Sequence, residues 1–213
     1  MANRQCMVFD GIDDYVDIAS IIISGDIDKT ISAWINPADL GQYVLGAVGQ
    51  YWLYYNATYN RFQMRNGISS DWIISSSSFP ANNWYLVTMV YESSGAIGTL
   101  YVNNNSYSDT VSSVIWSSGF TFIGRSGSSR YFNGKIDDVR IYNRALSEAE
   151  IKASYLGQTV SRTGLVGEWL FEGNALDTSD ETNNGTVYGA TYQDVPLRVQ
   201  GIQSITGIQS ITG

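Results

Sequence analysis

The chain has 213 residues, a formal net charge of −8, no histidine and a single cysteine, Cys6. Phosphate binding needs clustered Lys and Arg, so an acidic chain is not expected to bind nucleic acid. The lack of histidine excludes Ser-His-Asp and Cys-His catalysis and removes the commonest zinc ligands. A lone cysteine forms no internal disulfide, and Cys6 stands next to Met7 and Val8, so we expect a small buried residue.

Most of the chain has the pattern of β-strands. Ile31, Ala33 and Ile35 alternate on one face of a predicted strand, and residues 84–92 and 99–103 flank a Ser-Ser-Gly hairpin connection. Further strands are predicted at residues 15–18, 43–48, 52–55, 61–65, 72–75, 120–124, 135–142 and 166–171. Turns rich in Gly, Asn and Ser recur about every 8–12 residues, which is typical of an all-β sandwich.

A single helix is predicted among these strands, at residues 145–156. Ser147 and Glu150 have the spacing of a capping box, and Gly157 follows as a stop signal. Residues 158–163 form a short polar linker, and residues 201–213 repeat the unit GIQSIT. Isoleucine at every third position of this repeat does not match the two-residue period of a flat strand, so no structure is predicted for it.

Several motifs in a fixed order resemble one known family. They are FDGIDDYVDI (9–18), ISAWINP (31–37), NNWYLVTMVY (82–91), LYVNN (100–104), FIGR (122–125) and FNGKIDDVRIYNRALSEAEIKASY (132–155). The chain is similar to a laminin-G-like jelly roll of the concanavalin A-like lectin/glucanase superfamily. The resemblance implies an all-β fold, a two-sheet antiparallel jelly-roll sandwich with one short helix near residues 145–156.

The order of segments departs from that family, because residues 164–192 resemble its opening strand and loop yet come last. The predicted organisation is a jelly-roll body at 1–157, a linker at 158–163, the displaced opening strand and loop at 164–192, and a repetitive tail at 193–213. Three interpretations remain open: a circular permutation closed within one chain, a strand inserted into a neighbouring copy, or the truncated start of another domain. The third is least favoured, because it leaves Trp169, Leu170 and Phe171 without a core to enter.

No enzyme activity is expected, and no catalytic residue is assigned. The superfamily includes glycoside hydrolases, which need paired carboxylates on either side of a sugar bond. Their Glu-x-Asp-x-x-Glu cluster is absent, and acids near the middle of the chain, such as Asp71, Glu92 and Asp109, are isolated. A glycoside hydrolase therefore remains only a remote alternative.

The resemblance also implies a structural Ca²⁺ where the opening strand, the FDG loop and the final strand converge. Carried over residue by residue, its ligands are the Asp137 carboxylate and the carbonyls of Gly11 and Gly173. Strand alternation puts Asp137 and Asp138 on opposite faces, so only one of them serves as a ligand. The alternative is an exposed acidic edge that binds no metal.

Aromatic residues supply the candidate carbohydrate-binding surface, because aromatic faces stack on sugar rings. Residues 51–59 (YWLYYNATY) are dense in aromatics, with Tyr51, Leu53 and Tyr55 on one strand face, and most of these are expected in the core. The candidates are Tyr43, Trp52, Tyr54, Tyr59, Trp72, Trp116 and Tyr131.

Two functions follow from the sequence. The first, which the family resemblance implies, is a non-catalytic lectin-like module for glycan binding or adhesion, exposed at an extracellular surface or on a virion. The second is a structural decoration, capsid-associated or filament subunit that assembles as a homo-oligomer through its C-terminal strand and tail, with Ile202, Ile205, Ile208 and Ile211 as candidate contacts. No signal peptide is seen, so the protein either does not use that export route or has lost a leader. No apolar run of about 18 residues is seen, so membrane insertion is not expected.

Overall fold

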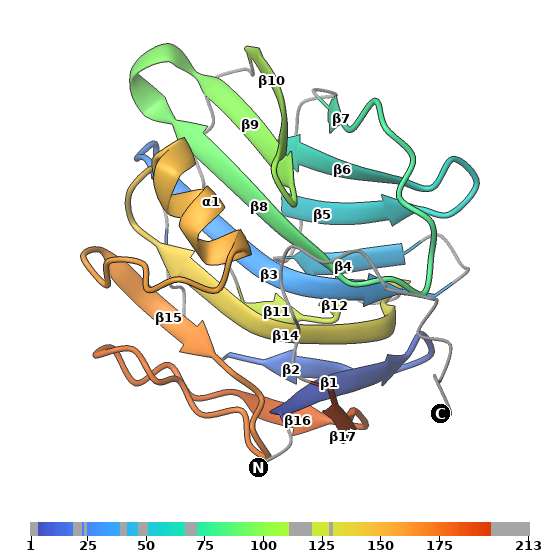
Figure 1. The fold of residues 1–213 in the computed structure, drawn as a ribbon. Helices are drawn as coiled ribbons and strands as arrows, with labels where there is room; N and C mark the ends of the chain where they lie inside the picture. Colours follow the sequence, from blue (N-terminus) through green and yellow to red (C-terminus); the bar gives the residue numbers. More distant parts are fainter. Residues whose placement is uncertain are drawn as a thin grey trace, which may run out of the picture.

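The computed structural model describes residues 4–18, 23, 25–38, 42–46, 51–66, 72–110, 121–127 and 130–196. The side chains of residues 42–46, 51, 52, 65, 66 and 72 lie outside this description. Two antiparallel sheets pack face to face around a hydrophobic core, and one helix lies outside (Figure 1). The predicted all-β jelly-roll sandwich is therefore confirmed.

The first sheet carries the helix on its outer side. Its order is β10 (Asn105–Thr110), β9 (Ile97–Val102), β8 (Tyr85–Glu92), β3 (Lys29–Pro37), β14 (Asn133–Tyr142), β1 (Arg4–Asp10) and β17 (Thr191–Val195), and β15 (Leu165–Trp169) also pairs with β14. A 3-10 turn at Ser93–Gly95 joins β8 to β9, in agreement with the predicted hairpin.

The second sheet closes the other side of the core. Its order is β16 (Thr186–Tyr188), β2 (Tyr15–Asp17), β11 (Phe122–Ile123), β4 (Gln42–Gly46), β5 (Tyr51–Asn56), β6 (Arg61–Asn66) and β7 (Trp72–Ile74). A separate hairpin pairs β12 (Arg125–Ser126) with β13 (Arg130–Tyr131). Every strand predicted from the sequence overlaps an observed strand, whereas β1 and the short or polar strands β10, β12, β13, β16 and β17 were not predicted.

Alternation of side chains along the strands decides which residues form the core. Ile31, Ala33 and Ile35 of β3 are buried in it, as predicted, and so are Leu53 and Tyr55 of β5. Cys6 is also fully buried, again as expected. Removing these apolar side chains from water is the main stabilising contribution to the sandwich.

The helix α1 (Glu148–Tyr155) begins with the predicted capping box. The Ser147 hydroxyl accepts from the Glu150 backbone, and the Glu150 carboxylate accepts from the Ser147 backbone at 2.9 Å. Tyr155 stacks on Trp34 of β3 with 6.1 Å between ring centroids, so the helix packs on the first sheet. Within the described part of the chain, no helix has the length and apolarity needed to cross a membrane.

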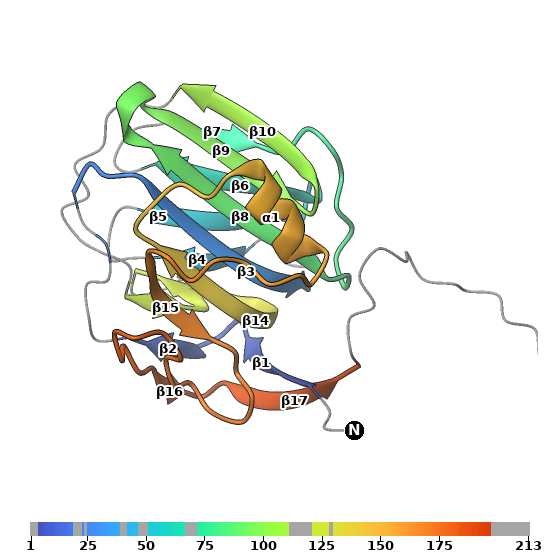
Figure 2. The same ribbon diagram turned by 60° about the vertical axis from the view of Figure 1, so that its left-hand side comes forward.

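Strand β14 pairs along one side with two segments that are far apart in the sequence. Its N-terminal half pairs with β1, with Met7 opposite Ile136, and its C-terminal half pairs with β15, with Trp169 opposite Val139 (Figure 2). The segment that resembles an opening strand thus pairs with β14 of its own chain. A permuted origin, or exchange of this strand with a neighbouring copy, stays a prediction.

We expect Trp169→Ala to lower the free energy of unfolding by about 3–5 kcal/mol, because it empties a fully buried indole site in the core. Leu176→Ala, in the same segment but 53% exposed, is the matched control and should change stability by less than about 0.5 kcal/mol. Chemical denaturation measures both. A tryptophan variant as stable as the control would show that residues 164–192 do not complete the core.

Candidate functional site

A bulge in β14 brings two acidic side chains to one cation. The register against β3 shifts between Asp137 and Arg140, and Asp138 has a φ of 50°. Arg4 Nε donates to Asp137 at 3.0 Å, and Arg4 Nη2 donates to Asp138 at 3.3 Å. The prediction that Asp137 and Asp138 point to opposite faces is therefore wrong, because a bulge interrupts the alternation on which it relied.

The three predicted calcium ligands do not gather in one place. The carboxylate of Asp137 is fully buried and pairs with Arg4, and Gly173 lies nearby, close to the Gln5 side chain. Gly11 lies beyond the other end of β1, because Asp10 pairs with Asn133, which is four residues or about 13 Å from Asp137 along the strand. The Asp137 carboxylate, for which the resemblance implied a metal, therefore pairs with the guanidinium of Arg4 instead.

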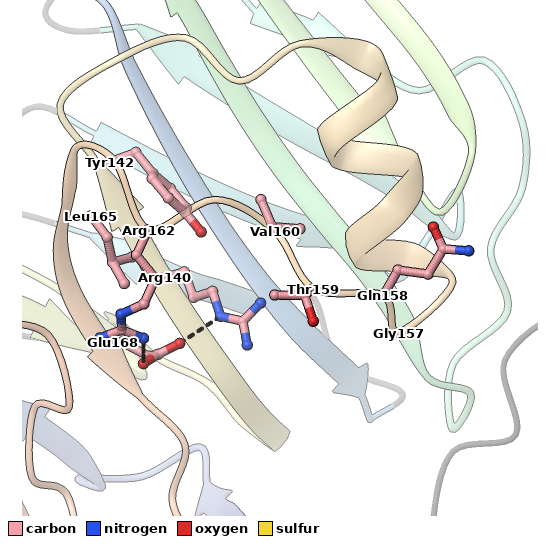
Figure 3. Close-up of a pocket in the computed structure, with 9 residues that line it drawn as sticks. All are labelled: Arg140, Tyr142, Gly157, Gln158, Thr159, Val160, Arg162, Leu165 and Glu168. Atoms are coloured by element: carbon pink, nitrogen blue, oxygen red, sulfur yellow. Dashed lines mark hydrogen bonds and ion pairs between the residues drawn. The ribbon is translucent and has the colours of Figure 1, made fainter.

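A groove lies between the linker after α1 and the outer side of β14 and β15 (Figure 3), with a volume of about 280 Å³. Arg140 and Arg162 both point at Glu168 there, at 3.0 and 2.8 Å. Burial opposes ionisation of Glu168, but hydrogen bonds from Arg162 and Thr178 and the charge of Arg140 outweigh it and hold its pKa below the usual range. Arg140 also pairs with Asp138 at 3.0 Å, so two carboxylates neutralise the two arginines, which favours a structural contact over a ligand site.

The acidic loop, residues 10–14, crosses from β1 of the first sheet to β2 of the second. Carboxylate oxygens of Asp10, Asp13 and Asp14 all lie within 4.8 Å of one another. The Asp14 carboxylate accepts from the Asp10 backbone at 2.9 Å, and Asp10 accepts from the Ile12 backbone at 2.8 Å. Three oxygen-bearing side chains therefore converge at one end of the sandwich.

Asp14 is the buried member of this loop. Burial raises its pKa, the charges of Asp10 and Asp13 add to the rise, and the hydrogen bond from the Asp10 backbone opposes it. Its Oδ1 lies so close to the Gly189 backbone that a side chain at 189 would overlap with it. Hard oxygen ligands whose negative charge is poorly compensated fit the coordination preferences of Ca²⁺.

A second group of side chains adjoins the acidic loop on the outer face of the second sheet. Val16, Ile123 and Val187 pack against the core, so their strand neighbours face outward. These neighbours, with two residues of the β12–β13 hairpin, form the tyrosine–arginine cluster: Tyr15, Phe122, Arg125, Tyr131 and Tyr188.

The geometry of this cluster is a layered stack. The rings of Tyr15 and Tyr188 are nearly parallel, with centroids 4.6 Å apart, and Tyr188 is 45% exposed. The guanidinium carbon of Arg125 lies 4.0 Å from the ring centroid of Tyr15 and 4.0 Å from that of Phe122. Tyr131 completes the group at 6.5 Å from Tyr15. The arrangement offers an exposed aromatic face beside a cation and the acidic loop.

Of the aromatic candidates whose side chains the structure describes, Tyr54, Tyr59 and Tyr131, only Tyr131 belongs to this cluster. Tyr54 is half-buried on β5, and Tyr59 is 64% exposed in the turn after it. The side chains of Tyr43, Trp52 and Trp72, and all of Trp116, Ile202, Ile205, Ile208 and Ile211, lie outside the described residues. Sequence reasoning missed Tyr15, Arg125 and Tyr188, although alternation in Tyr-Val-Asp and Thr-Val-Tyr gave a weak signal for the two tyrosines.

A smaller hollow of about 260 Å³ opens on the outer side of the first sheet, on the other side of the acidic loop. Asn36, Asn82, Asn133 and Lys135 supply its polar lining. It adjoins the acidic loop because Asn133 pairs with Asp10. Polar groups therefore continue from the loop onto both sheets.

The sheet order, the outer helix and the aromatic face define a lectin-like jelly roll. Residues 10–152 match the model of the family Laminin_G_3, described as the concanavalin A-like lectin/glucanases superfamily. The chain therefore belongs to this superfamily, which confirms the resemblance seen in its motifs. A comparison with curated proteins found no match.

Solved structures share the fold at low sequence identity. A candidate carbohydrate binding protein from Bacteroides ovatus has a TM-score of 0.75 and 20% identity over 94% of this chain and 63% of its own. A heptameric SAP-like pentraxin from Limulus polyphemus has a TM-score of 0.70 and 13% identity over 94% of this chain and 98% of its own. The extracellular region of zebrafish Gpr126/Adgrg6 has a TM-score of 0.64 and 16% identity over 93% of this chain and 27% of its own.

Proposed function

We propose that the chain is a non-catalytic carbohydrate-binding module whose site is the tyrosine–arginine cluster beside the acidic loop. The observation that carries this proposal is the stacked Tyr15–Tyr188 pair, whose outer ring is 45% exposed on a sheet face. An exposed aromatic face stacks on the C–H groups of a sugar ring, and nearby polar groups fix its orientation. The fold shared with the candidate carbohydrate binding protein from Bacteroides ovatus supports the same class of ligand.

The surroundings of other acidic groups support a non-catalytic role. Hydrolysis of a sugar bond by two carboxylates needs them free on either side of that bond. Asp137 and Asp138 pair with Arg4, and Glu168 is held between Arg140 and Arg162. Such ion pairs stabilise strand contacts, and the chain has no histidine to take over the proton transfers.

Calcium belongs to this proposal as a structural ion of the acidic loop. Asp10, Asp13 and Asp14 would hold it, and it would supply positive charge to three neighbouring carboxylates. Asp14 directly precedes Tyr15, and Gly189 directly follows Tyr188, so the loop and the stacked tyrosines are joined at both strand ends. An ordered loop would therefore also order the glycan site.

We expect Ca²⁺ to raise the Tm at about pH 7 and to raise it much less at about pH 4. The folded-state pKa of Asp14 is raised, so its ionisation destabilises the calcium-free protein as the pH rises through that pKa, and bound Ca²⁺ offsets this loss. Asp14→Asn should abolish the calcium-dependent rise, whereas Asp109→Asn, at an exposed position on β10, should keep it. Thermal melts with CaCl₂ and with EDTA give the comparison, and identical melts would remove calcium from the proposal.

We expect Tyr188→Ala to weaken glycan binding about tenfold or more, equivalent to about 1.4 kcal/mol, by removing the exposed stacking face. Tyr59→Ala is the matched control, because Tyr59 is also exposed but lies in the turn after β5. A broad glycan array with CaCl₂, followed by titration of the best ligand, provides the measurement. If the wild-type chain binds no glycan on the array, the carbohydrate-binding proposal is rejected. If Tyr59→Ala loses more glycan binding than Tyr188→Ala, the binding site lies near Tyr59 instead.

A structural subunit is the second candidate function, and the edge strand β17 favours it. Strand β17 ends the order of the first sheet and pairs on one side with β1. The open side of an edge strand can accept a strand from another chain. In this alternative the chain would assemble with copies of itself through β17 and the tail at an extracellular or virion surface.

We expect light scattering to separate the two functions, applied to the full chain and to one ending at Pro196, which keeps β17. A defined oligomer that becomes monomeric when the tail is removed would support assembly as the main role. A monomer in both cases would reject assembly by the chain alone and leave the carbohydrate-binding module.

A further inference from the structure

Arg125 differs from the arginines of this chain that form ion pairs. Arg4, Arg140, Arg144 and Arg162 each form an ion pair with a carboxylate of this chain. Across the described ranges, Arg125 forms no such pair, and its Nε is buried without a hydrogen-bond partner. A buried donor without an acceptor costs free energy, so the chain holds this guanidinium without satisfying it. The residue as a whole is only partly buried, so the remaining N–H groups of the guanidinium can reach an acceptor from outside the chain.

Aromatic rings hold the Arg125 side chain in place. Its guanidinium carbon lies 4.0 Å from the ring centroids of both Tyr15 and Phe122. Contacts with ring faces are attractive to the cation, yet they provide no oxygen acceptor for its N–H groups. The side chain is therefore positioned in advance, which reduces the entropy lost when it receives a ligand.

The position of Arg125 relative to the exposed tyrosine defines two neighbouring contacts. Tyr188 stacks on Tyr15 at 4.6 Å, and Arg125 approaches the same ring to 4.0 Å. Two groups at such distances cannot share one face of the ring without clashing, so Tyr15 lies between Tyr188 and Arg125. A sugar stacked on Tyr188 is therefore separated from the fixed guanidinium of Arg125 by the rings of Tyr188 and Tyr15.

We propose that the glycan site selects acidic sugars, with Arg125 receiving the carboxylate of a uronic or sialic acid residue while Tyr188 stacks on a sugar ring. This inference rests on the proposed carbohydrate-binding function and names the ligand class of that same site. The planar guanidinium matches a carboxylate through two parallel N–H···O hydrogen bonds, a geometry that an ammonium group does not reproduce. Sulfated sugars share the anionic chemistry, and the experiment below separates them from carboxylated ones.

The test compares acidic glycans with the same glycans after chemical reduction of their carboxyl groups to alcohols. This treatment removes the carboxylate and keeps the remaining sugar, and it leaves sulfate esters in place. We expect wild-type binding of carboxylated glycans to fall about tenfold or more on reduction. Arg125→Gln should lower binding of the untreated glycans by a similar factor and leave binding of the reduced glycans unchanged.

Two further variants sharpen this comparison. Arg61→Gln makes the same change in net charge on β6, which β4 and β5 separate from β11, and should leave all binding unchanged. Arg125→Lys keeps the charge but loses the paired geometry, so it should recover only part of the wild-type binding. Thermal melts of each variant confirm that the fold is retained.

Each of the remaining outcomes would overturn a different part of the proposal. Equal wild-type binding of untreated and reduced glycans would reject selection of carboxylates and leave the carbohydrate-binding function intact. Preference for sulfated glycans that survives reduction would reject the carboxylate as the ligand group. An equal loss for untreated and reduced glycans in Arg125→Gln would mean that Arg125 only supports the site. Failure of the wild-type chain to bind any glycan would reject the proposed function itself.

Discussion

Strand β14 joins β1 and β15, which are far apart in the sequence, to the body of the sandwich. It pairs with β3 on one side and, on the other, with β1 and β15 placed end to end. At the junction, the bulge at Asp137 and Asp138 turns both carboxylates toward Arg4 of β1, and Arg140 links Asp138 to Glu168 of β15. Partly buried charges of this kind are tolerated only when each is paired, so the network ties the correct register of β1 to that of β15.

The docking of strands at this junction also positions the residues of the candidate site. Tyr15 follows β1 and the acidic loop, whereas Tyr188 belongs to the segment that follows β15. The two tyrosines stack only because β16 pairs with β2, so the exposed aromatic face combines residues far apart in the sequence. Docking of the C-terminal segment thus completes the glycan site and the hydrophobic core together.

The net negative charge of the chain and the local positive charge of the site act on an acidic ligand over different distances. A net charge of −8 opposes the approach of an anionic glycan, but charges separated by more than about 8 Å are largely screened at physiological salt. At contact distance the local groups decide, namely the guanidinium of Arg125 and, when bound, a calcium ion at Asp10, Asp13 and Asp14. Selectivity in this site therefore depends on local geometry.

The sequence by itself determined the features that depend on neighbouring residues. Alternation placed Ile31, Ala33 and Ile35 in the core, the Ser147–Glu150 spacing fixed the start of the helix, and ordered motifs identified the superfamily. Only the tertiary structure decided the facing of Asp137 and Asp138, the separation of Gly11 from Asp137, and the stack of Tyr15, Tyr188 and Arg125. A bulge and the register of strands from distant segments depend on long-range pairing, and no local sequence pattern encodes that pairing.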